Sequence, residues 1–282
     1  MSVTNLTEIH LGQRRHGAGT QGLDEAEDLA RNERLEKIRE GALATIHSWE
    51  LVTAVDGPGT RLTIFFSGCP LRCLYCHNPD TMFAKDGQDV ELDALLKRIR
   101  RYRPVFKASG GGITLSGGEV LQQPKFAARL LHETKKMGIH TTIDTSGFLG
   151  RNVTDAMLAD IDLVLLDVKS GNEQTYQKVT GRALAPTISF GDRLAASGTE
   201  IWGRFVLVPG LTDDFENVEQ VADIMARWAT LSRVEVLPFH QMGADKWDAL
   251  GREYQLADAK PPTLELLERV RGQFRKRGLT VY

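Results

Sequence analysis

The sequence is poor in cysteine and close to electrical neutrality. Of its 282 residues three are cysteine, and 35 lysine and arginine residues nearly balance 37 aspartate and glutamate residues, which leaves a formal net charge of −2. Three cysteines are too few for a framework of disulfides. A net charge close to zero also gives no sign of binding to nucleic acid or to an anionic membrane. We therefore expect no nucleic-acid partner and no membrane partner.

Long apolar stretches are absent as well. No run approaches the roughly 20 apolar residues that a membrane-spanning helix requires, and the first residues, MSVTNLTEIHLGQRRHGAGTQG, contain no apolar centre of the kind found in signal peptides. We expect a cytoplasmic protein, and in that reducing compartment clustered cysteines serve metal or redox chemistry. The remaining composition, 41% hydrophobic and 26% charged, is that of a globular chain able to bury a large core.

What is present falls into two parts. Residues 1–41 are rich in glycine, glutamine and charge of both signs and contain few large apolar side chains, so this segment has little to bury. It is predicted to be an extension that forms at most a solvated helix. Residues 42–282 are predicted to form a single domain.

From residue 42 onward, short β-branched and aromatic runs alternate with amphipathic runs. The first kind predicts strands at 44–50, 61–66, 112–115, 140–144, 161–167, 201–208 and 233–239. The second kind predicts helices at 91–102, 124–138, 153–159, 173–180, 216–231 and 263–277. Such alternation indicates an α/β fold with a parallel sheet and right-handed crossovers.

The positions of the polar and glycine-rich residues distinguish two α/β architectures. A doubly wound sheet gathers its functional residues at one switch point, whereas a barrel collects them from the carboxyl ends of many strands. Here such residues follow nearly every predicted strand, beginning with the cysteine segment and SGGE and continuing with Asp144, Asp167, Arg204 and His240. We therefore predict an open, partial (β/α)6 barrel.

All three cysteines lie in one short segment, GCPLRCLYCHNPD, at residues 68–80. Three buried structural thiols are a poor interpretation, because residues flanked by Gly68 and Pro70 will not all face a core. The C-x-x-C-H pattern within the segment matches a c-type haem site, although that leaves Cys69 unexplained. Closed zinc sites use three cysteines and a histidine, here His77, yet their ligands usually come from two separate elements.

An iron–sulfur cluster accounts for the number of cysteines. A cubane cluster normally takes four thiolates, so a chain with only three leaves one iron open to a ligand from outside the protein. Cys69, Cys73 and Cys76 lie close enough along the chain for their sulfurs to converge on one cluster. The missing fourth cysteine then marks the place where a substrate or a cofactor binds iron.

The CxxxCxxC spacing, with Tyr75 immediately before the last cysteine, resembles the radical S-adenosylmethionine (radical SAM) enzymes. The resemblance implies one 4Fe–4S cluster held by the three cysteines, and S-adenosylmethionine bound to the open iron through its amino and carboxylate groups. In that family one electron from the cluster cleaves S-adenosylmethionine to methionine and a 5′-deoxyadenosyl radical, while the protein supplies placement.

Further segments narrow the resemblance to the enzymes that activate glycyl-radical enzymes, and most of all to the pyruvate formate-lyase activating family. These segments are VDGPGTR, FFSGCPLRCLYCHNPD, ASGGGITLSGGE, HTTIDTSGF, DLVLLDVKS, RFVLVPGLTDD and LPFH, in order from about residue 42 to the C-terminus. The resemblance implies an enzyme that removes a Cα hydrogen from one glycine of pyruvate formate-lyase. It also implies a flavodoxin- or ferredoxin-type electron donor, and we expect a monomer.

The same resemblance implies roles for individual residues. The expected S-adenosylmethionine-binding residues are Tyr75, His77, Gly117, Gly118, Glu119, Asp144, Asp167, Val168, Lys169 and His240. Asp144 is also expected beside a monovalent cation, since carboxylate oxygens suit hard cations. Asp56 and Arg204 are expected at the substrate peptide, with Arg204 facing the barrel interior. Without the resemblance, the aspartates would be strand-end caps, SGGE a tight turn and His240 a structural histidine.

Two other kinds of function stay open at this point. A radical SAM enzyme with these motifs can instead activate another glycyl-radical enzyme or act on a small molecule, because the motifs alone do not identify the substrate. A non-enzymatic module that binds zinc or a cluster, and uses residues 1–41 to bind a partner, is the alternative from another class. The absence of further cysteines argues against activating enzymes that carry an inserted ferredoxin-like domain.

Overall fold

Six parallel strands form the body of the sheet in this computed structural model, which describes residues 29–53 and 55–282. They pair in chain order: β2 (Arg61–Phe66), β4 (Gly112–Gly117), β5 (His140–Thr145), β6 (Leu163–Asp167), β7 (Glu200–Leu207) and β8 (Leu231–Pro238). Within the described residues β8 does not pair back to the other end of the sheet. The prediction of an open (β/α)6 barrel is therefore confirmed.

Two antiparallel strands extend this sheet beyond β2. β1 (Leu43–Thr53) pairs with β2, and β3 (Gln88–Glu91) pairs with the outer edge of β1. β3 is not among the predicted strands, because its sequence QDVE is short and polar and only its pairing with β1 makes it a strand. At the opposite edge, Val281 forms a parallel bridge with Val234 of β8, so the end of the chain covers that edge.

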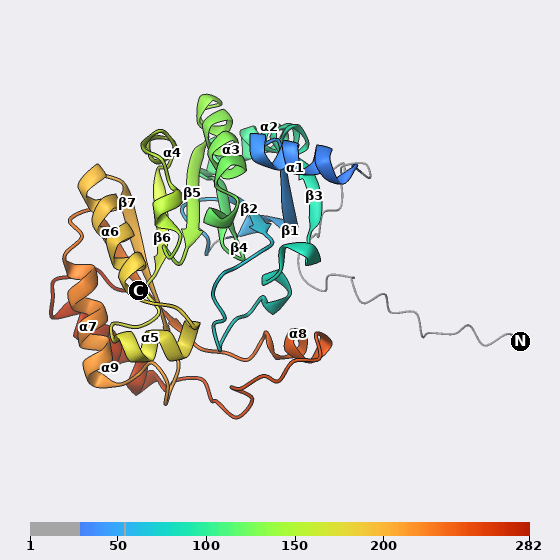
Figure 1. Ribbon diagram of the computed structural model, residues 1–282. Helices are drawn as coiled ribbons and strands as arrows, with labels where there is room; N and C mark the ends of the chain where they lie inside the picture. The colour runs from blue at the N-terminus through green and yellow to red at the C-terminus, as the bar shows by residue number, and fades with distance from the viewer. Residues whose placement is uncertain (1–28, 54) are drawn as a thin grey trace, which may run out of the picture.

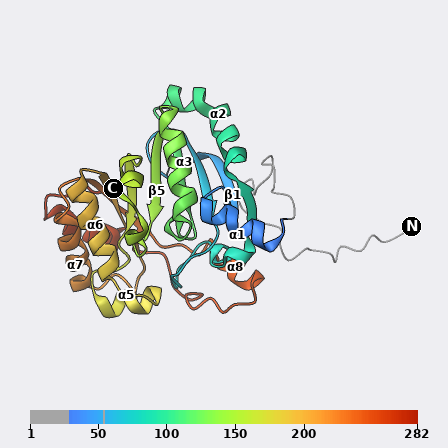
Figure 2. The same ribbon diagram turned by 45° about the horizontal axis from the view of Figure 1, so that its top comes forward.

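Helices cover the outer face of the curved sheet, as Figures 1 and 2 show. α2, α3, α6 and α9 contact β4, β5, β7 and β8 in turn, as expected for crossovers of one hand. The helices are α1 (Arg31–Glu40), α2 (Leu92–Ser109), α3 (Pro124–Lys136), α4 (Asp155–Ala159), α5 (Glu173–Thr180), α6 (Ala185–Ser197), α7 (Phe215–Ala226), α8 (Ala244–Ala249) and α9 (Leu264–Arg275). No described helix is both long and apolar enough to cross a bilayer.

α6 and the short α8 are missing from the predicted elements. The sequence of α6, APTISFGDRLAAS, contains a proline, a glycine and β-branched residues that weaken a helical pattern. In the structure Pro186 occupies the first turn, where proline is tolerated, and Gly198 ends the helix in the left-handed conformation. Gly191 lies against the ring of Trp228, where a Cβ atom would collide. Tertiary packing therefore accounts for a glycine that local propensity disfavours.

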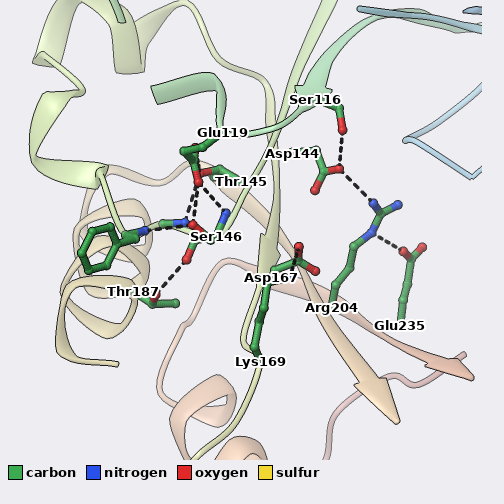
Figure 3. A network of polar contacts seen from close by, with 12 residues as sticks. Ser116, Glu119, Asp144, Thr145, Ser146, Asp167, Lys169, Thr187, Arg204 and Glu235 are labelled. Atoms are coloured by element: carbon green, nitrogen blue, oxygen red, sulfur yellow. Dashed lines mark hydrogen bonds and ion pairs between the residues drawn. The ribbon is translucent and has the colours of Figure 1, made fainter. Parts of the chain in front are cut away.

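Side chains on each strand alternate between two environments. Ile64, Leu115, Val164 and Phe205 are fully buried in the core between the sheet and the helices. The alternate positions face the inside of the barrel, and near the carboxyl ends of the strands they carry Ser116, Asp144, Asp167, Arg204 and Glu235 (Figure 3). The interior is therefore polar at the end of the sheet where the functional loops begin.

Arg61 closes the opposite, amino-terminal end of the barrel. Its side chain is completely buried and donates to Thr114 Oγ1 at 3.0 Å and to Thr142 Oγ1 at 2.7 Å, and it lies 3.1 Å from Nδ1 of His140. Burial lowers the pKa of Arg61 to about 10, against the attraction of Asp56, so the guanidinium stays charged at neutral pH. The charged guanidinium of Arg61, bound to hydroxyl groups, therefore fills the amino-terminal end of the barrel.

The described part of the N-terminal segment is the helix α1. None of its side chains is buried, and two ion pairs join it to β3, Arg34–Asp89 at 2.5 Å and Lys37–Glu91 at 2.6 Å. It also contacts α3 and β1. Residues 1–28 of the predicted extension lie outside the described residues, and the domain boundary after residue 41 stays a prediction.

Deleting residues 1–40 should leave the barrel folded. Exposed ion pairs contribute about 0–1 kcal/mol each, and α1 buries no side chain of its own, so we expect the free energy of unfolding to fall by at most about 2 kcal/mol. Denaturant unfolding measures this change, with the double substitution Arg34→Ala and Lys37→Ala as the control for the ion pairs alone. A truncated chain that aggregates would show that the segment belongs to the barrel domain.

Candidate active site

The three cysteines lie on the loop that leaves the carboxyl end of β2, where the barrel interior is polar. Each side chain is half-buried and none forms a disulfide. Backbone hydrogen bonds hold the loop in place, because Cys69 N–H donates to the carbonyl of Met82 at 3.1 Å and Leu74 N–H donates to that of Val179 at 3.0 Å. The loop is therefore attached to the last turn of α5 and to the turn that follows it in sequence.

The segment after β8 holds the same loop from another side. The indole Nε1 of Trp247 donates to the carbonyl of Cys76 at 2.9 Å, and Nζ of Lys246 donates to Oδ1 of Asn78 at 2.6 Å. Both donors lie on α8. α8 thus holds the backbone at the third cysteine and at the residues that follow it.

The SGGE segment runs directly beside the start of the cysteine loop. Gly118 N–H donates to the carbonyl of Phe66 at 2.8 Å, and Glu119 N–H donates to that of Gly68 at 2.8 Å. A Cβ atom on Gly117 would collide with the backbone of Phe66, and one on Gly118 with that of Gly68. These glycines are required by the close approach of two protein segments, and their predicted contact with a ligand stays a prediction.

The carboxylate of Glu119 is buried and accepts four hydrogen bonds (Figure 3). Oε1 accepts from Thr145 Oγ1 at 2.6 Å and from Leu121 N–H at 3.2 Å. Oε2 accepts from the Ser146 hydroxyl at 2.5 Å and from Ser146 N–H at 3.1 Å. The carboxylate of Glu119 thus holds the loop after β5, and its expected contact with S-adenosylmethionine stays a prediction.

Asp144 and Arg204 lie together inside the barrel. Oδ2 of Asp144 accepts from the Ser116 hydroxyl at 2.7 Å and lies 3.6 Å from Nη1 of Arg204, whose Nε donates to Glu235 at 2.9 Å. Burial raises the pKa of Asp144 above its usual range, while the charge of Arg204 lowers it and that of Asp167 raises it further. The monovalent cation expected at Asp144 stays a prediction, and a guanidinium already lies beside this carboxylate.

Asp167 is the last residue of β6, and Val168 and Lys169 follow it. The side chains of these three residues lie in different surroundings. Nζ of Lys169 lies 2.8 Å from Oδ2 of Asp167 and 5.8 Å from the ring centre of Tyr75. Burial lowers the pKa of Lys169, but the attraction of Asp167 outweighs it and holds the pKa well above its usual value. Val168 is fully buried and its side chain lies in the core, so only its backbone is placed to contact a cofactor.

His77 and His240 lie face to face although 163 residues separate them. Their ring centroids are 4.1 Å apart with an angle of 31° between the planes, and Nε2 of His77 lies 3.2 Å from the carbonyl oxygen of His240. Burial lowers the pKa of His77, and the charge of His240 lowers it further. The structure therefore brings together the two histidines that the sequence predicts for the cofactor.

Asp56 lies on the loop between β1 and β2, and its contacts reach into the barrel interior. Oδ2 of Asp56 accepts from Thr63 Oγ1 at 3.1 Å, its carbonyl accepts from Thr114 Oγ1 at 2.6 Å, and Arg204 donates to the carbonyl of Val55. The two residues predicted for the substrate peptide, Asp56 and Arg204, therefore belong to one connected group.

A cavity of about 390 Å³ opens between β1 and the loop that follows β8. Its walls combine side chains from β1, from the cysteine loop and from the segment after β8, among them His47, Glu50, Asp56, His77, His240 and Met242. It joins the histidine pair to Asp56, so a molecule that enters there reaches both groups.

Comparison with known proteins agrees with this geometry. The model of the radical SAM superfamily matches residues 63–222. The pyruvate formate-lyase 1-activating enzyme of Escherichia coli is 41% identical over 238 residues, which cover 84% of this chain and 97% of the relative. This chain belongs to the radical SAM superfamily and, within it, to the family of the pyruvate formate-lyase-activating enzymes.

Two further matches extend the comparison. The pyruvate formate-lyase-activating enzyme of Clostridium pasteurianum is 43% identical over 216 residues, covering 77% of this chain and 90% of the relative. Among solved structures, a radical SAM methyltransferase from Sphaerobacter thermophilus aligns with a TM-score of 0.56 and 18% identity, over 90% of this chain and 81% of that one. The structural match supports the partial barrel fold alone.

As a radical SAM protein, the chain uses a 4Fe–4S cluster and S-adenosylmethionine, and the residues present fit both. Three free thiols on one loop leave one corner of a cubane open. Burial raises the pKa of each of the three thiols, so a nearby positive centre such as iron is needed to hold them as thiolates. The buried hydroxyl of Tyr75 has no hydrogen-bond partner among the described residues, which leaves a polar atom for a ligand.

A single zinc ion fits less well than a cluster. Zinc lies about 2.3 Å from each thiolate that binds it, so its ligands must converge on one point. In the described part of the chain no three His, Cys, Asp or Glu side chains converge closely enough to hold one metal ion. A cubane is larger, and its corners can accept sulfurs that stand further apart.

Sequence reasoning does not identify Glu235 or Trp247. Glu235 pairs with Arg204, and its position between the buried residues Val234 and Val236 marks an inward charged side chain, so the two-residue period of the strand could have revealed it. Trp247 contacts a carbonyl 171 residues away and leaves no local signal.

Glu119→Gln should weaken the binding of S-adenosylmethionine while cluster assembly is kept. The new amide nitrogen would face donors on Thr145 and Ser146, so the loop after β5 would lose part of its attachment. We expect the Kd to rise about tenfold, or about 1.4 kcal/mol, in titrations followed by the EPR signal of the reduced cluster. Glu173→Gln, which changes a carboxylate bonded to Leu184 N–H at the surface, is the control. Loss of iron instead of affinity would contradict this role.

Proposed function

We propose that this chain is the activating enzyme of pyruvate formate-lyase. It takes a Cα hydrogen from one glycine of that partner, with S-adenosylmethionine as co-substrate, and leaves a glycyl radical together with methionine and 5′-deoxyadenosine. A flavodoxin- or ferredoxin-type protein supplies the electron that this reaction consumes. The enzyme acts as a monomer in the cytoplasm.

One observation carries this proposal. Relatives named for this activity match the chain at 41% and 43% identity over 97% and 90% of their own lengths. Nearly every part of those relatives therefore has a counterpart here. The polar barrel interior, the cysteine loop and the cavity beside it supply the places that the activity needs.

In this proposal Cys69, Cys73 and Cys76 hold the cluster. When bound, the cluster supplies the one electron that cleaves the sulfonium bond of S-adenosylmethionine. The chain keeps the reacting groups away from water, because α5 and α8 enclose the loop from two sides. The chain also fixes the orientation of the reacting groups, because Glu119 holds the loop after β5 in one position.

Further residues orient S-adenosylmethionine. Lys169, held by Asp167, offers a compact cation to the carboxylate of the cofactor, and the backbone of Gly117 and Gly118 faces its amino group. His77 and His240, stacked at 4.1 Å, lie toward the ribose and adenine. Tyr75 and the backbone of Val168 also line the cofactor. Asp144 lies near the carboxylate group of the cofactor, beside a monovalent cation.

The partner's glycine segment enters through the cavity between β1 and the loop after β8. Asp56 lies inside this cavity, and Arg204 holds the loop that carries Asp56, so both meet the incoming peptide backbone. Only a glycine has no side chain to obstruct access to its Cα atom. A glycine segment therefore brings its Cα atom closest to the cofactor when it enters this cavity.

The test of this proposal is a reaction of the reduced protein with S-adenosylmethionine and pyruvate formate-lyase. We expect the EPR doublet of a glycyl radical on the partner and one molecule of 5′-deoxyadenosine per radical. Cys73→Ala should abolish both while circular dichroism stays unchanged, because a cluster held by two thiolates is not retained. A variant that still cleaves S-adenosylmethionine would refute the assignment of the cysteines, and cleavage without a radical on this partner would point to another substrate.

Met242→Trp should slow activation of the partner without slowing cofactor cleavage. Met242 is 75% exposed and lines the cavity, so a larger ring there narrows the entrance. We expect kcat/KM for a glycine-containing peptide to fall about tenfold, or about 1.4 kcal/mol, while cleavage of S-adenosylmethionine without peptide stays within about twofold. Leu264→Trp, at a position that is 81% exposed on α9, is the matched control. Equal effects of the two substitutions would remove the cavity from the peptide path.

A further inference from the structure

Four cationic side chains surround the outer side of the cysteine loop. Three of them gather around one ring, since Arg72, Lys85 and Arg252 place their charged groups 5.0, 5.9 and 4.8 Å from the centre of Phe83. The fourth, Arg182, donates from Nε to the carbonyl of Pro70 at 2.8 Å, on the same loop. We call Arg72, Lys85, Arg182 and Arg252 the basic patch.

The basic patch is exposed and its charges are not neutralised. Arg72, Lys85 and Arg182 are exposed and Arg252 is half-buried. None of the four forms an ion pair with a carboxylate among the described residues, whereas many other cations of the chain do. Even if the two carboxylates next to them in sequence, Asp86 and Glu253, are counted against the four cations, the patch keeps a net positive charge.

The patch touches the backbone that carries the first cysteine. Nη1 of Arg72 donates to the carbonyl of Cys69 at 2.6 Å. Nη1 of Arg252 contacts Sδ of Met82 at 3.5 Å, and the carbonyl of Met82 accepts from Cys69 N–H at 3.1 Å. Arg72 therefore contacts a cluster ligand directly, and a single residue, Met82, separates Arg252 from the same ligand.

The basic patch and the cavity are different surfaces. The cavity is lined by β1, by the histidine pair and by Met242, and it shares no residue with the patch. β1 lies between β3 and β2 in the sheet, and α8 lies on the segment after β8 (Figure 1). A protein bound at the patch would leave the cavity free for the glycine segment.

We propose that the basic patch is the docking surface for a small acidic electron-carrier protein, which passes one electron to the cluster through the Cys69 side of the loop. This rests on the proposed function, because that reaction consumes one electron for each glycyl radical formed. Opposite charges on two partners raise the rate at which they meet and orient them, and both effects weaken as salt screens them. A patch of four cations fits the acidic surface of such a carrier, and its contact with the Cys69 loop keeps the electron path short.

The first experiment measures binding without turnover. The double variant Lys85→Glu and Arg252→Glu changes the charge by four units without touching a cysteine or a residue of the cavity. The probe is an acidic flavodoxin, titrated against the cluster-loaded protein at about 20 mM and about 200 mM salt. We expect its Kd to rise at least tenfold for the variant at low salt, and the difference between variant and wild type to shrink at high salt.

A matched control carries the same change in charge elsewhere. Arg101 and Arg103 are exposed on α2, and Arg103 lies near His140 at the amino end of β5, whereas the cysteine loop follows the carboxyl end of β2. Their double replacement by glutamate should leave the Kd within about twofold of wild type. If both double variants weaken flavodoxin equally, net charge alone is responsible and the docking surface is refuted.

The second experiment separates delivery of the electron from its use. Cleavage of S-adenosylmethionine is measured with reduced flavodoxin and, in parallel, with photoreduced 5-deazariboflavin, a small uncharged reductant. The patch variant should lose at least tenfold of the flavodoxin-driven rate and keep the deazaflavin-driven rate within about twofold. Equal loss with both reductants would mean that the patch supports the cluster and not a carrier, and would overturn the proposal.

Two further outcomes are distinguishable. If wild-type protein does not cleave S-adenosylmethionine with deazaflavin, the proposed function fails, and the binding titration still decides whether the patch recognises an acidic protein. If the patch variant binds flavodoxin normally but loses affinity for pyruvate formate-lyase, the patch serves the substrate protein and the proposal is wrong. Lys85→Gln with Arg252→Gln, which removes charge without reversing it, should give an intermediate Kd and guards against misfolding of the reversed variant.

Discussion

Glu119, through its backbone and its buried carboxylate, connects the ends of three parallel strands, and the rest of the site depends on that connection. Glu119 follows β4, its N–H donates to Gly68 after β2, and its side chain accepts from Thr145 and Ser146 at the end of β5. A carboxylate without water is tolerated only when hydrogen bonds meet its charge, and here four donors do so. The cysteine loop and the loop after β5 therefore keep one relative position, which a cofactor bound at several points requires.

The charged side chains inside the barrel are also held by partners. Arg204 lies between Asp144 and Glu235 and also holds the loop of Asp56, while Lys169 is paired with Asp167. Burial lowers the pKa of Arg204, but the surrounding carboxylates outweigh burial and raise it. Buried charges are stable when each has a partner. These partners hold the polar groups of the site in fixed positions, which is the condition for electrostatic preorganisation.

Two separate surfaces lie beside the cysteine loop in this open barrel. The gap between β1 and the segment after β8 leads to the histidine pair and Asp56, whereas the basic patch lies outside the cysteine loop. The six parallel strands and the core under the helices are common to the superfamily fold. Within the described residues the sheet is not closed, so one side of the barrel is not sealed by paired strands.

The sequence by itself determined the six βα units, the cysteine loop and the polar strand ends, because strand period, cysteine spacing and strand-end position are local features. Only the tertiary structure decided that β3 is a strand, that Gly191 belongs in a helix against Trp228, and that Glu119 holds a loop. The stacking of His77 on His240 and the bond from Trp247 to Cys76 were likewise decided there. These contacts join residues far apart in the chain, and no local pattern records which distant partner a side chain will meet.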